Sequence, residues 1–382
     1  MNLNIDSTRK TNQKIGSPTW CNEIYNSNYI EWFGKPFFGK EGYNIKPCCL
    51  FNDDKMIFVE NIDDIQSKVQ EMWPTYNHKE TCKVCIDKEK LGFSSKRTES
   101  IYRQKPEDGL VRFDLRPGNT CNLKCIMCNP KNSSQWYQDI EVWTEFNGDY
   151  WLAKDRRDKD RGNLDWDWIY SKCIDKVNEL YIAGGEPFYM KNIQKFLKDL
   201  SNHSWNCDNT RVVIQTNGIS NTPKFLETLK KYKRLHFSIS QDGWGEVNEL
   251  IRFPTNHDEL MVGIQELLDC NPYYFDWNIT VQAMNLPNID LTVQKLKDTF
   301  KVDTRLGFLY HVYKLYHPDY LSINCLKPHV IHNLNVKQED VKGFIKDYEY
   351  DEKGNERMQK FLLALDEKRG TNSPAIIPWC FE

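Results

Sequence analysis

Between residues 110 and 312 the sequence alternates short runs rich in β-branched and aromatic residues with longer segments of helical periodicity. We expect helices at 192–200, 224–232 and 290–299. Because parallel strands need crossover connections, this alternation predicts an α/β fold with a parallel sheet, which right-handed crossovers curl into a partial (β/α)6 barrel. The expected strands cover residues 110–115, 180–183, 211–215, 235–239, 277–283 and 306–312.

The residues that follow these strands carry most of the candidate chemistry. Cys121 comes soon after the first expected strand, and a GGEP segment at 184–187 follows the second. The third and fourth strands run into TNG at 216–218 and QDG at 241–243. In barrels of parallel strands, ligands bind at the carboxyl ends of the strands. The sequence therefore predicts one ligand site that all these segments share.

A compact cysteine triplet dominates this edge of the expected barrel. Cys121, Cys125 and Cys128 lie within eight residues. Cysteine thiolates hold iron–sulfur clusters, so the triplet predicts a 4Fe–4S cluster with one iron left open to another ligand. Structural zinc is the alternative, but it usually takes four ligands from two separated pairs. The isolated triplet favours iron and sulfur.

A second group of cysteines precedes the expected barrel. Cys21, Cys48, Cys82 and Cys85 form a four-thiolate set that is large enough to hold another cubane, and Cys49 is an alternative to Cys48. Zinc is a rival at this set, because a C-x2-C pair with two distant cysteines is also typical of zinc sites. The residue types leave both metals open.

Charge and hydropathy restrict the partners. No apolar run approaches the roughly 20 residues of a membrane helix, and the polar residues 1–14 lack the apolar stretch of a secretory signal. A cytoplasmic location is therefore expected, where clustered cysteines serve metals or catalysis more often than disulfides. The formal net charge of −3 argues against a nucleic-acid partner.

The C-x3-C-x2-C triplet and the GGEP segment resemble the radical S-adenosylmethionine (radical SAM) superfamily. In that superfamily the triplet follows the first strand of a partial barrel, and GGEP follows the second. The resemblance implies that Cys121, Cys125 and Cys128 hold the 4Fe–4S cluster and that S-adenosylmethionine (SAM) binds its open iron. Reductive cleavage of SAM would then give a 5′-deoxyadenosyl radical that abstracts hydrogen from a substrate.

The resemblance also implies contacts to SAM from several strand ends. Glu186 and neighbouring backbone groups would line the site of the SAM amino group, and a serine of the SISQDG segment at 238–243 would meet the ribose. Arg252 suits the SAM carboxylate, although a helix-surface arginine has the same sequence pattern. Met127 stands where the superfamily often has an aromatic residue. The implied set is Met127, Gly184, Gly185, Glu186, Pro187, Asn217, Ser238, Ser240, Arg252 and Gln282.

The N-terminal cysteine pattern resembles the twitch subgroup of the superfamily, in which half of a SPASM-type domain binds an auxiliary cluster. Two features depart from the subgroup: the spacing from Cys21 to Gly42 is long, and the module precedes the barrel. The expected domains are a twitch-like module at 1–107, the barrel at 108–326 and a helical extension at 327–382. Within this extension, DEKRG at 366–370 predicts a helix end.

The subgroup resemblance implies a peptide or protein substrate that undergoes oxidation, epimerisation or crosslinking. A dehydrogenase or mutase acting on a small molecule, such as a sugar or nucleotide, is the alternative. The resemblance implies a one-electron reductant such as a flavodoxin or ferredoxin. A hypothesis of another class is a non-catalytic zinc or iron–sulfur binding module. The sequence assigns no catalytic acid, base or hydrogen donor.

Overall fold

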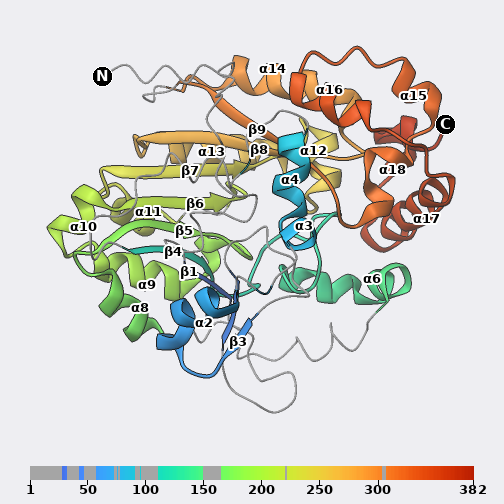
Figure 1. Cartoon of the computed structure of the whole chain (residues 1–382). Coiled ribbons are helices and arrows are strands. Elements are labelled where there is room, and N and C mark those ends of the chain that lie inside the picture. Colours follow the sequence, from blue (N-terminus) through green and yellow to red (C-terminus); the bar gives the residue numbers. More distant parts are fainter. Residues whose placement is uncertain are drawn as a thin grey trace.

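The computed structural model describes residues 28–31, 43–46, 57–72, 75, 78–90, 95, 111–148, 165–219, 222–302 and 307–382. These residues form one nine-stranded sheet in the order β3-β2-β1-β4-β5-β6-β7-β8-β9 (Figure 1). The strands are β1 (Asn28–Glu31), β2 (Tyr43–Lys46), β3 (Ile57–Val59), β4 (Val111–Arg116), β5 (Val177–Ile182), β6 (Arg211–Thr216), β7 (Arg234–Ser240), β8 (Tyr274–Val281) and β9 (Leu309–Lys314).

Strands β4 to β9 pair in parallel, each with the next one along the chain. All six overlap the predicted strands, and the sheet is open, so the predicted partial α/β barrel is confirmed. The sheet extends beyond the prediction, because β1 pairs in parallel with β4 while β2 and β3 continue in antiparallel pairing. The domain boundary expected at residue 107 lies outside the described residues, and the three-part division stays a prediction.

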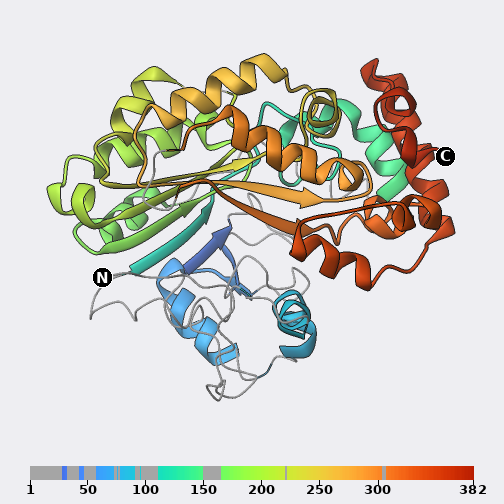
Figure 2. The ribbon, with the colours of Figure 1, turned by 90° about the horizontal axis from the view of Figure 1, so that it is seen from above.

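Helices connect these strands and cover one face of the sheet. Figure 2 shows the green to orange helices on one side of the strands and the blue N-terminal helices on the other. In α9, residues Ile193, Phe196, Leu197 and Leu200 are buried at the spacing of a single apolar helix face. The connecting helices are α8 (Trp166–Cys173), α9 (Lys191–Leu200), α10 (Ser204–Asn209), α11 (Pro223–Leu229), α12 (Glu246–Ile251), α13 (His257–Leu268) and α14 (Ile289–Thr299).

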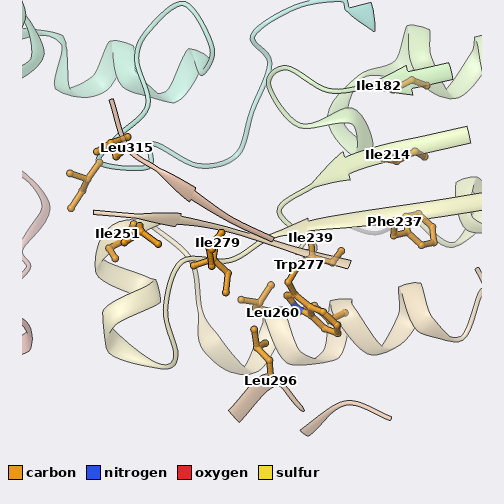
Figure 3. Packing of buried hydrophobic residues seen from close by; sticks show 14 of the residues in the cluster. Ile182, Ile214, Phe237, Ile239, Ile251, Leu260, Trp277, Ile279, Leu296 and Leu315 are labelled. Carbon is orange, nitrogen blue, oxygen red and sulfur yellow. The ribbon is translucent and has the colours of Figure 1, made fainter. Parts of the chain in front are cut away.

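The two faces of the barrel strands differ in chemistry because side chains alternate along a strand. Ile214, Phe237 and Ile279 point to the buried side, where Figure 3 shows them with Leu260 of α13 and Leu296 of α14. The alternate positions carry polar side chains joined by hydrogen bonds across the strands. This polar face runs toward the ends of the strands at which the candidate residues lie.

The chain ends in helices that return to the start of the barrel. The predicted helix end is confirmed: α17 (Glu352–Arg369) stops at Gly370, whose φ is +70°. The ring of Phe361 in α17 stacks on Trp136 at 6.4 Å between ring centroids. The other helices outside the barrel are α2 (Ile65–Met72), α3 (His78–Thr81), α4 (Lys83–Lys90), α6 (Ile140–Asn147), α15 (Pro328–His332), α16 (Glu339–Lys346) and α18 (Ser373–Ile376).

In the part of the chain that the structure describes, none of the helices has the length and apolar character needed to cross a membrane.

Candidate functional site

The cysteine triplet lies in the loop between β4 and the 3-10 helix η4 (Ser134–Asp139). Main-chain hydrogen bonds fix this loop against the segment that ends α12. The amide of Lys124 donates to the carbonyl of Phe253 at 2.7 Å, and that of Ile126 donates to Ile251 at 2.8 Å. The amide of Cys128 donates to the carbonyl of Cys125 at 2.9 Å. The loop is therefore fixed both by hydrogen bonds to the end of α12 and by a hydrogen bond between its own residues.

The three thiols interact with one another electrostatically. Burial raises the pKa of Cys121 to about 12, and the nearby Cys125 adds to the rise. Burial likewise raises the pKa of the Cys128 thiol, with smaller contributions from the other two cysteines. Three half-buried thiolates close together are costly without a positive partner. An iron–sulfur cluster supplies that charge, so the donor set fits the group that the triplet predicts.

The described residues contain no group of three or more His, Cys, Asp or Glu side chains placed to hold one metal ion.

The GGEP segment packs directly on the start of the cysteine loop. Gly184 and Gly185 have φ values of +87° and +53°. A Cβ added to Gly185 would lie 2.3 Å from the carbonyl oxygen of Thr120, so only glycine fits this approach. The amide of Glu186 donates to the same Thr120 carbonyl at 2.8 Å. The end of β5 thus fixes the residue that precedes Cys121.

Glu186 links the ends of two neighbouring strands. Glu186 is 1% exposed. Its carboxylate accepts hydrogen bonds from the Thr216 hydroxyl at 2.7 Å and from the Asn217 main-chain amide at 2.8 Å. Burial raises the pKa of Glu186 to about 7, although these hydrogen bonds act to lower it. The Asn217 side chain in turn donates to Asn122 at 2.7 Å, which attaches β6 to the cysteine loop.

Arg252 lies in the interior beside the thiols, so the alternative of a helix-surface arginine is wrong. Its side chain is 12% exposed, and its Nη2 atom lies 2.8 Å from Oδ2 of the fully buried Asp242. Its Nη1 atom lies 3.9 Å from Sγ of Cys125. Burial alone would lower the pKa of Arg252, but the charges of Asp242, Cys125 and Cys128 raise it. The guanidinium therefore bridges a carboxylate and the triplet.

The two serines of β7 have different surroundings. The Ser238 hydroxyl donates to Asp276 and accepts from the Asn278 amide. The Ser240 hydroxyl accepts a hydrogen bond of 2.6 Å from Gln215, so its own hydrogen is not used in that contact. Ser240 is consequently the better placed of the two to donate to a ligand.

Gln282, just beyond β8, has a fully buried side chain whose two polar atoms have no hydrogen-bond partner in the described structure. An unsatisfied buried polar group costs about 1–3 kcal/mol, so such a side chain indicates a missing partner. The remaining predicted residues lie at the same edge. Met127 is half-buried against the core, and Pro187 starts the 3-10 helix η5 (Pro187–Tyr189).

A buried histidine on the polar face is a feature that the sequence did not reveal. His236 on β7 lies between Arg211 of β6, whose Nη2 is 2.8 Å from the histidine Nδ1, and Asp276 of β8. Because arginine can only donate, Nδ1 accepts, and the ring proton lies on Nε2 facing Asp276. Burial tends to raise the pKa of Asp276, but the contacts with His236 and Ser238 bring it below its usual range. Arg211, His236 and Asp276 come together through the register of three neighbouring strands, which the sequence alone does not give.

A second missed feature lies behind the cysteine loop. The carboxylate of Asp139 accepts from Lys124 Nζ at 2.8 Å and from Arg369 Nε at 2.7 Å, and all three side chains are at most 9% exposed. Arg369 lies 230 residues from Asp139 in the chain. Its sequence context predicted only a helix end, so no local signal identified it.

The proposed N-terminal metal set is described only in part. Cys82 follows α3 and is half-buried, and Cys85 is buried in α4. The amide of Ile86 donates to the Cys82 carbonyl at 3.0 Å, as expected for one turn of helix. Cys21, Cys48 and Cys49 lie outside the described residues. The four-thiolate set therefore stays a prediction.

The family model described as the radical SAM superfamily matches residues 115–281. This stretch contains the cysteine triplet, the GGEP segment and strands β5 to β8. The sequence similarity to the superfamily therefore covers most of the parallel strands and the loops that follow them.

Several solved structures resemble the chain at low identity. anSMEcpe with bound AdoMet and the Cp18Cys peptide is 17% identical over 67% of this chain and 60% of its own, with a TM-score of 0.34. SuiB of Streptococcus suis bound to S-adenosylmethionine is 14% identical over 90% and 70%, with a TM-score of 0.34. TYW1 with a lysine-pyruvate adduct is 12% identical over 61% and 72%, with a TM-score of 0.31. The chain thus spans less than two thirds of the length of anSMEcpe. No curated protein matches the sequence significantly.

Proposed function

We propose that this chain is a radical SAM enzyme whose cluster is held by Cys121, Cys125 and Cys128. The superfamily match over residues 115–281 carries the proposal, because it includes all three cysteines. When bound, a 4Fe–4S cluster with SAM supplies reductive cleavage of SAM to a 5′-deoxyadenosyl radical that abstracts hydrogen from a substrate. The protein's part is to position these groups and to exclude water.

The strand ends supply the proposed SAM contacts. Gln282 offers a donor and an acceptor that have no partner among the described residues, and Ser240 keeps a hydroxyl hydrogen for the ribose. Arg252, anchored by Asp242, would hold the carboxylate of SAM. Glu186 uses three acceptor positions within the protein and keeps one for the amino group. The contacts at Met127, Gly184, Gly185, Pro187, Asn217 and Ser238 belong to the same proposal.

Peptide or protein oxidation, epimerisation or crosslinking is the reaction class that we propose, with an auxiliary cluster at Cys21, Cys48, Cys82 and Cys85. The support is the likeness of the N-terminal cysteine pattern to the twitch subgroup. A flavodoxin or ferredoxin would supply the electron. This substrate class predicts that a peptide, and not a sugar or nucleotide, stimulates SAM cleavage by the reconstituted protein.

The proposed metal content is tested by iron and sulfide analysis with electron paramagnetic resonance of the anaerobically reconstituted protein. Two cubanes give about eight irons, and the Cys121/Cys125/Cys128→Ala variant should keep about four. Cys82/Cys85→Ala should lose the other four. Cys207→Ala, which removes a half-buried cysteine outside both sets, is the matched control and should keep all eight.

The outcomes separate the hypotheses. SAM should change the spectrum of the wild type and of Cys82/Cys85→Ala, but not that of the triplet variant. About four irons falling to zero, together with bound zinc, would make the N-terminal set a zinc site. A folded wild-type protein that binds no iron would refute the proposed enzyme and favour a non-catalytic module.

A further inference from the structure

A buried group of charged side chains lies directly behind Cys125. It consists of Lys124, Asp139 and Arg369, which the ion pairs to Asp139 hold together. Two of its members are cations and one is an anion, so these three side chains carry a net charge of plus one. Asp366, a further carboxylate on α17 whose charge also acts on Arg369, is hydrogen-bonded to Thr371 and Ser373 at the end of the helix.

Arg369 is seated on two aromatic rings that also contact the cysteine loop. Its guanidinium carbon lies 4.8 Å from the ring centroid of Trp136 and 5.2 Å from that of Phe253. The indole of Trp136 donates to the carbonyl of Cys125 at 3.0 Å, and the carbonyl of Phe253 accepts from the amide of Lys124. One layer of aromatic side chains therefore joins the guanidinium to the backbone that carries Cys125.

The bonding of Arg369 is incomplete. Its side chain is 1% exposed, and its Nε atom binds Asp139, but the buried Nη1 and Nη2 atoms have no hydrogen-bond partner among the described residues. Burying a cation without full compensation is expensive, so a further negative group is expected nearby. The carbonyl of Cys125 accepts from the indole of Trp136, the ring on which this guanidinium rests, so the cation lies close to that cysteine.

We propose that Arg369 is a positioning residue that stabilises the reduced form of the cluster held at Cys125 and thereby sets its reduction potential. The inference rests on the proposed function, because it requires a cluster at the triplet. Reduction adds one negative charge to the cluster, and a nearby buried cation favours the more negative state. Arg369 is fixed on α17 and touches neither SAM nor substrate in this role. Its contribution is an electric field on the loop.

The test measures the midpoint potential of the SAM-responsive cluster by a redox titration followed by electron paramagnetic resonance. Arg369→Gln removes the charge, while Asp139 keeps its partner Lys124. We expect the ratio of reduced to oxidised cluster at fixed potential to fall about tenfold, which for one electron is a negative shift of about 59 mV. Arg369→Lys keeps the charge and should restore most of the potential.

Two more variants make the sign of the effect decisive. Asp139→Asn removes the anion of the group and should shift the potential in the positive direction. Lys368→Gln removes a neighbouring cation of the same helix that is 42% exposed, and solvent screening should leave its potential at the wild-type value. A general loss of packing would not produce shifts of opposite sign.

The results distinguish failure of this inference from failure of the proposed function. A wild-type protein without a SAM-responsive cluster would refute the proposed function. A normal cluster whose potential is the same in wild type and Arg369→Gln, or shifts equally in Lys368→Gln, would overturn the role of Arg369 alone. If Arg369→Gln does not fold, Asp139→Asn decides: a positive shift supports the role, and an unchanged or negative one overturns it.

Discussion

The two cysteine-bearing regions of this molecule are built in different ways. The triplet loop is fixed by residues distant in sequence: Gly185 after β5, Asn217 after β6 and Ile251 at the end of α12. Cys82 lies between α3 and α4, and Cys85 lies in the first turn of α4, where the amide of Ile86 donates to the carbonyl of Cys82. The position of the triplet therefore depends on the packing of the open sheet and its helices, whereas the two cysteines of the pair are near neighbours in one stretch of the chain.

The largest effect should separate the chemistry of the two regions. Cys125→Ala should reduce reductive SAM cleavage to the background level, because one thiolate of the cluster is lost. Cys85→Ala should retain it, since the proposed SAM site lies at the triplet. The measurement is 5′-deoxyadenosine formed in the presence of dithionite, quantified by chromatography. Equal loss in both variants would show that the two regions act as one site.

Long-range support of the triplet predicts a large cost at Gly185. Gly185→Ala places a methyl group against the Thr120 carbonyl at a positive φ, which should lower the free energy of unfolding by about 3 kcal/mol. Gly370→Ala is the control, because its φ is also positive but no atom lies within 4 Å of the added Cβ. It should cost about 1 kcal/mol. Urea unfolding of the apoproteins measures both, and equal costs would contradict the close approach.

The pH dependence of stability tests the strand-end contact at Glu186. Its pKa of about 7 in the folded protein lies above the ordinary 4.5, so the folded state binds more protons than the unfolded state between these values. The stabilising contribution is present at low pH and is lost as pH rises toward 7. Relative to Glu186→Gln, the wild-type apoprotein should gain about 2 kcal/mol between pH 7.5 and pH 5. Parallel stability profiles would exclude this coupling.

A smaller effect tests whether the site extends from the loop to β7. Ser240→Ala should weaken SAM binding about fivefold, the loss of one hydrogen bond of about 1 kcal/mol, with a smaller cost in stability because only the half-buried Gln215 amide loses a partner. Ser238→Ala should instead lower stability by about 1 kcal/mol, because Asp276 and Asn278 lose a partner. Calorimetric titration with SAM and thermal unfolding distinguish the two serines. Weaker SAM binding in Ser238→Ala together with lower stability in Ser240→Ala would contradict this assignment.

Local periodicity accounts for the parts of the fold that sequence predicted. The strand expected at 211–215 is observed at Arg211–Thr216, whereas the one expected at 277–283 begins three residues earlier and ends two residues earlier, as Tyr274–Val281. The strand β1 was not predicted because it has only four residues, Asn28–Glu31, which pair with residues 113–116 of β4. Short strands have too little pattern to be recognised alone.

The residues of the candidate site likewise fall into those that local sequence predicted and those that it did not. Residues at predicted strand ends, such as Glu186 and Asn217, lie beside the cysteine loop because parallel strands end at one edge. The ion pair of Asp139 with Arg369 and the contact of His236 with Asp276 join elements whose proximity depends on the complete packing. No sequence period links them.

The long separation between Asp139 and Arg369 has a consequence for biosynthesis. On the ribosome, the cysteine loop and Lys124 are made together with Asp139, and these two side chains alone form a neutral pair. The positive charge behind Cys125 arises only when residue 369, which is 230 positions later than Asp139, has been translated and α17 has docked. An emerging chain therefore carries the three thiols and Arg252 before it carries the buried charge of Arg369.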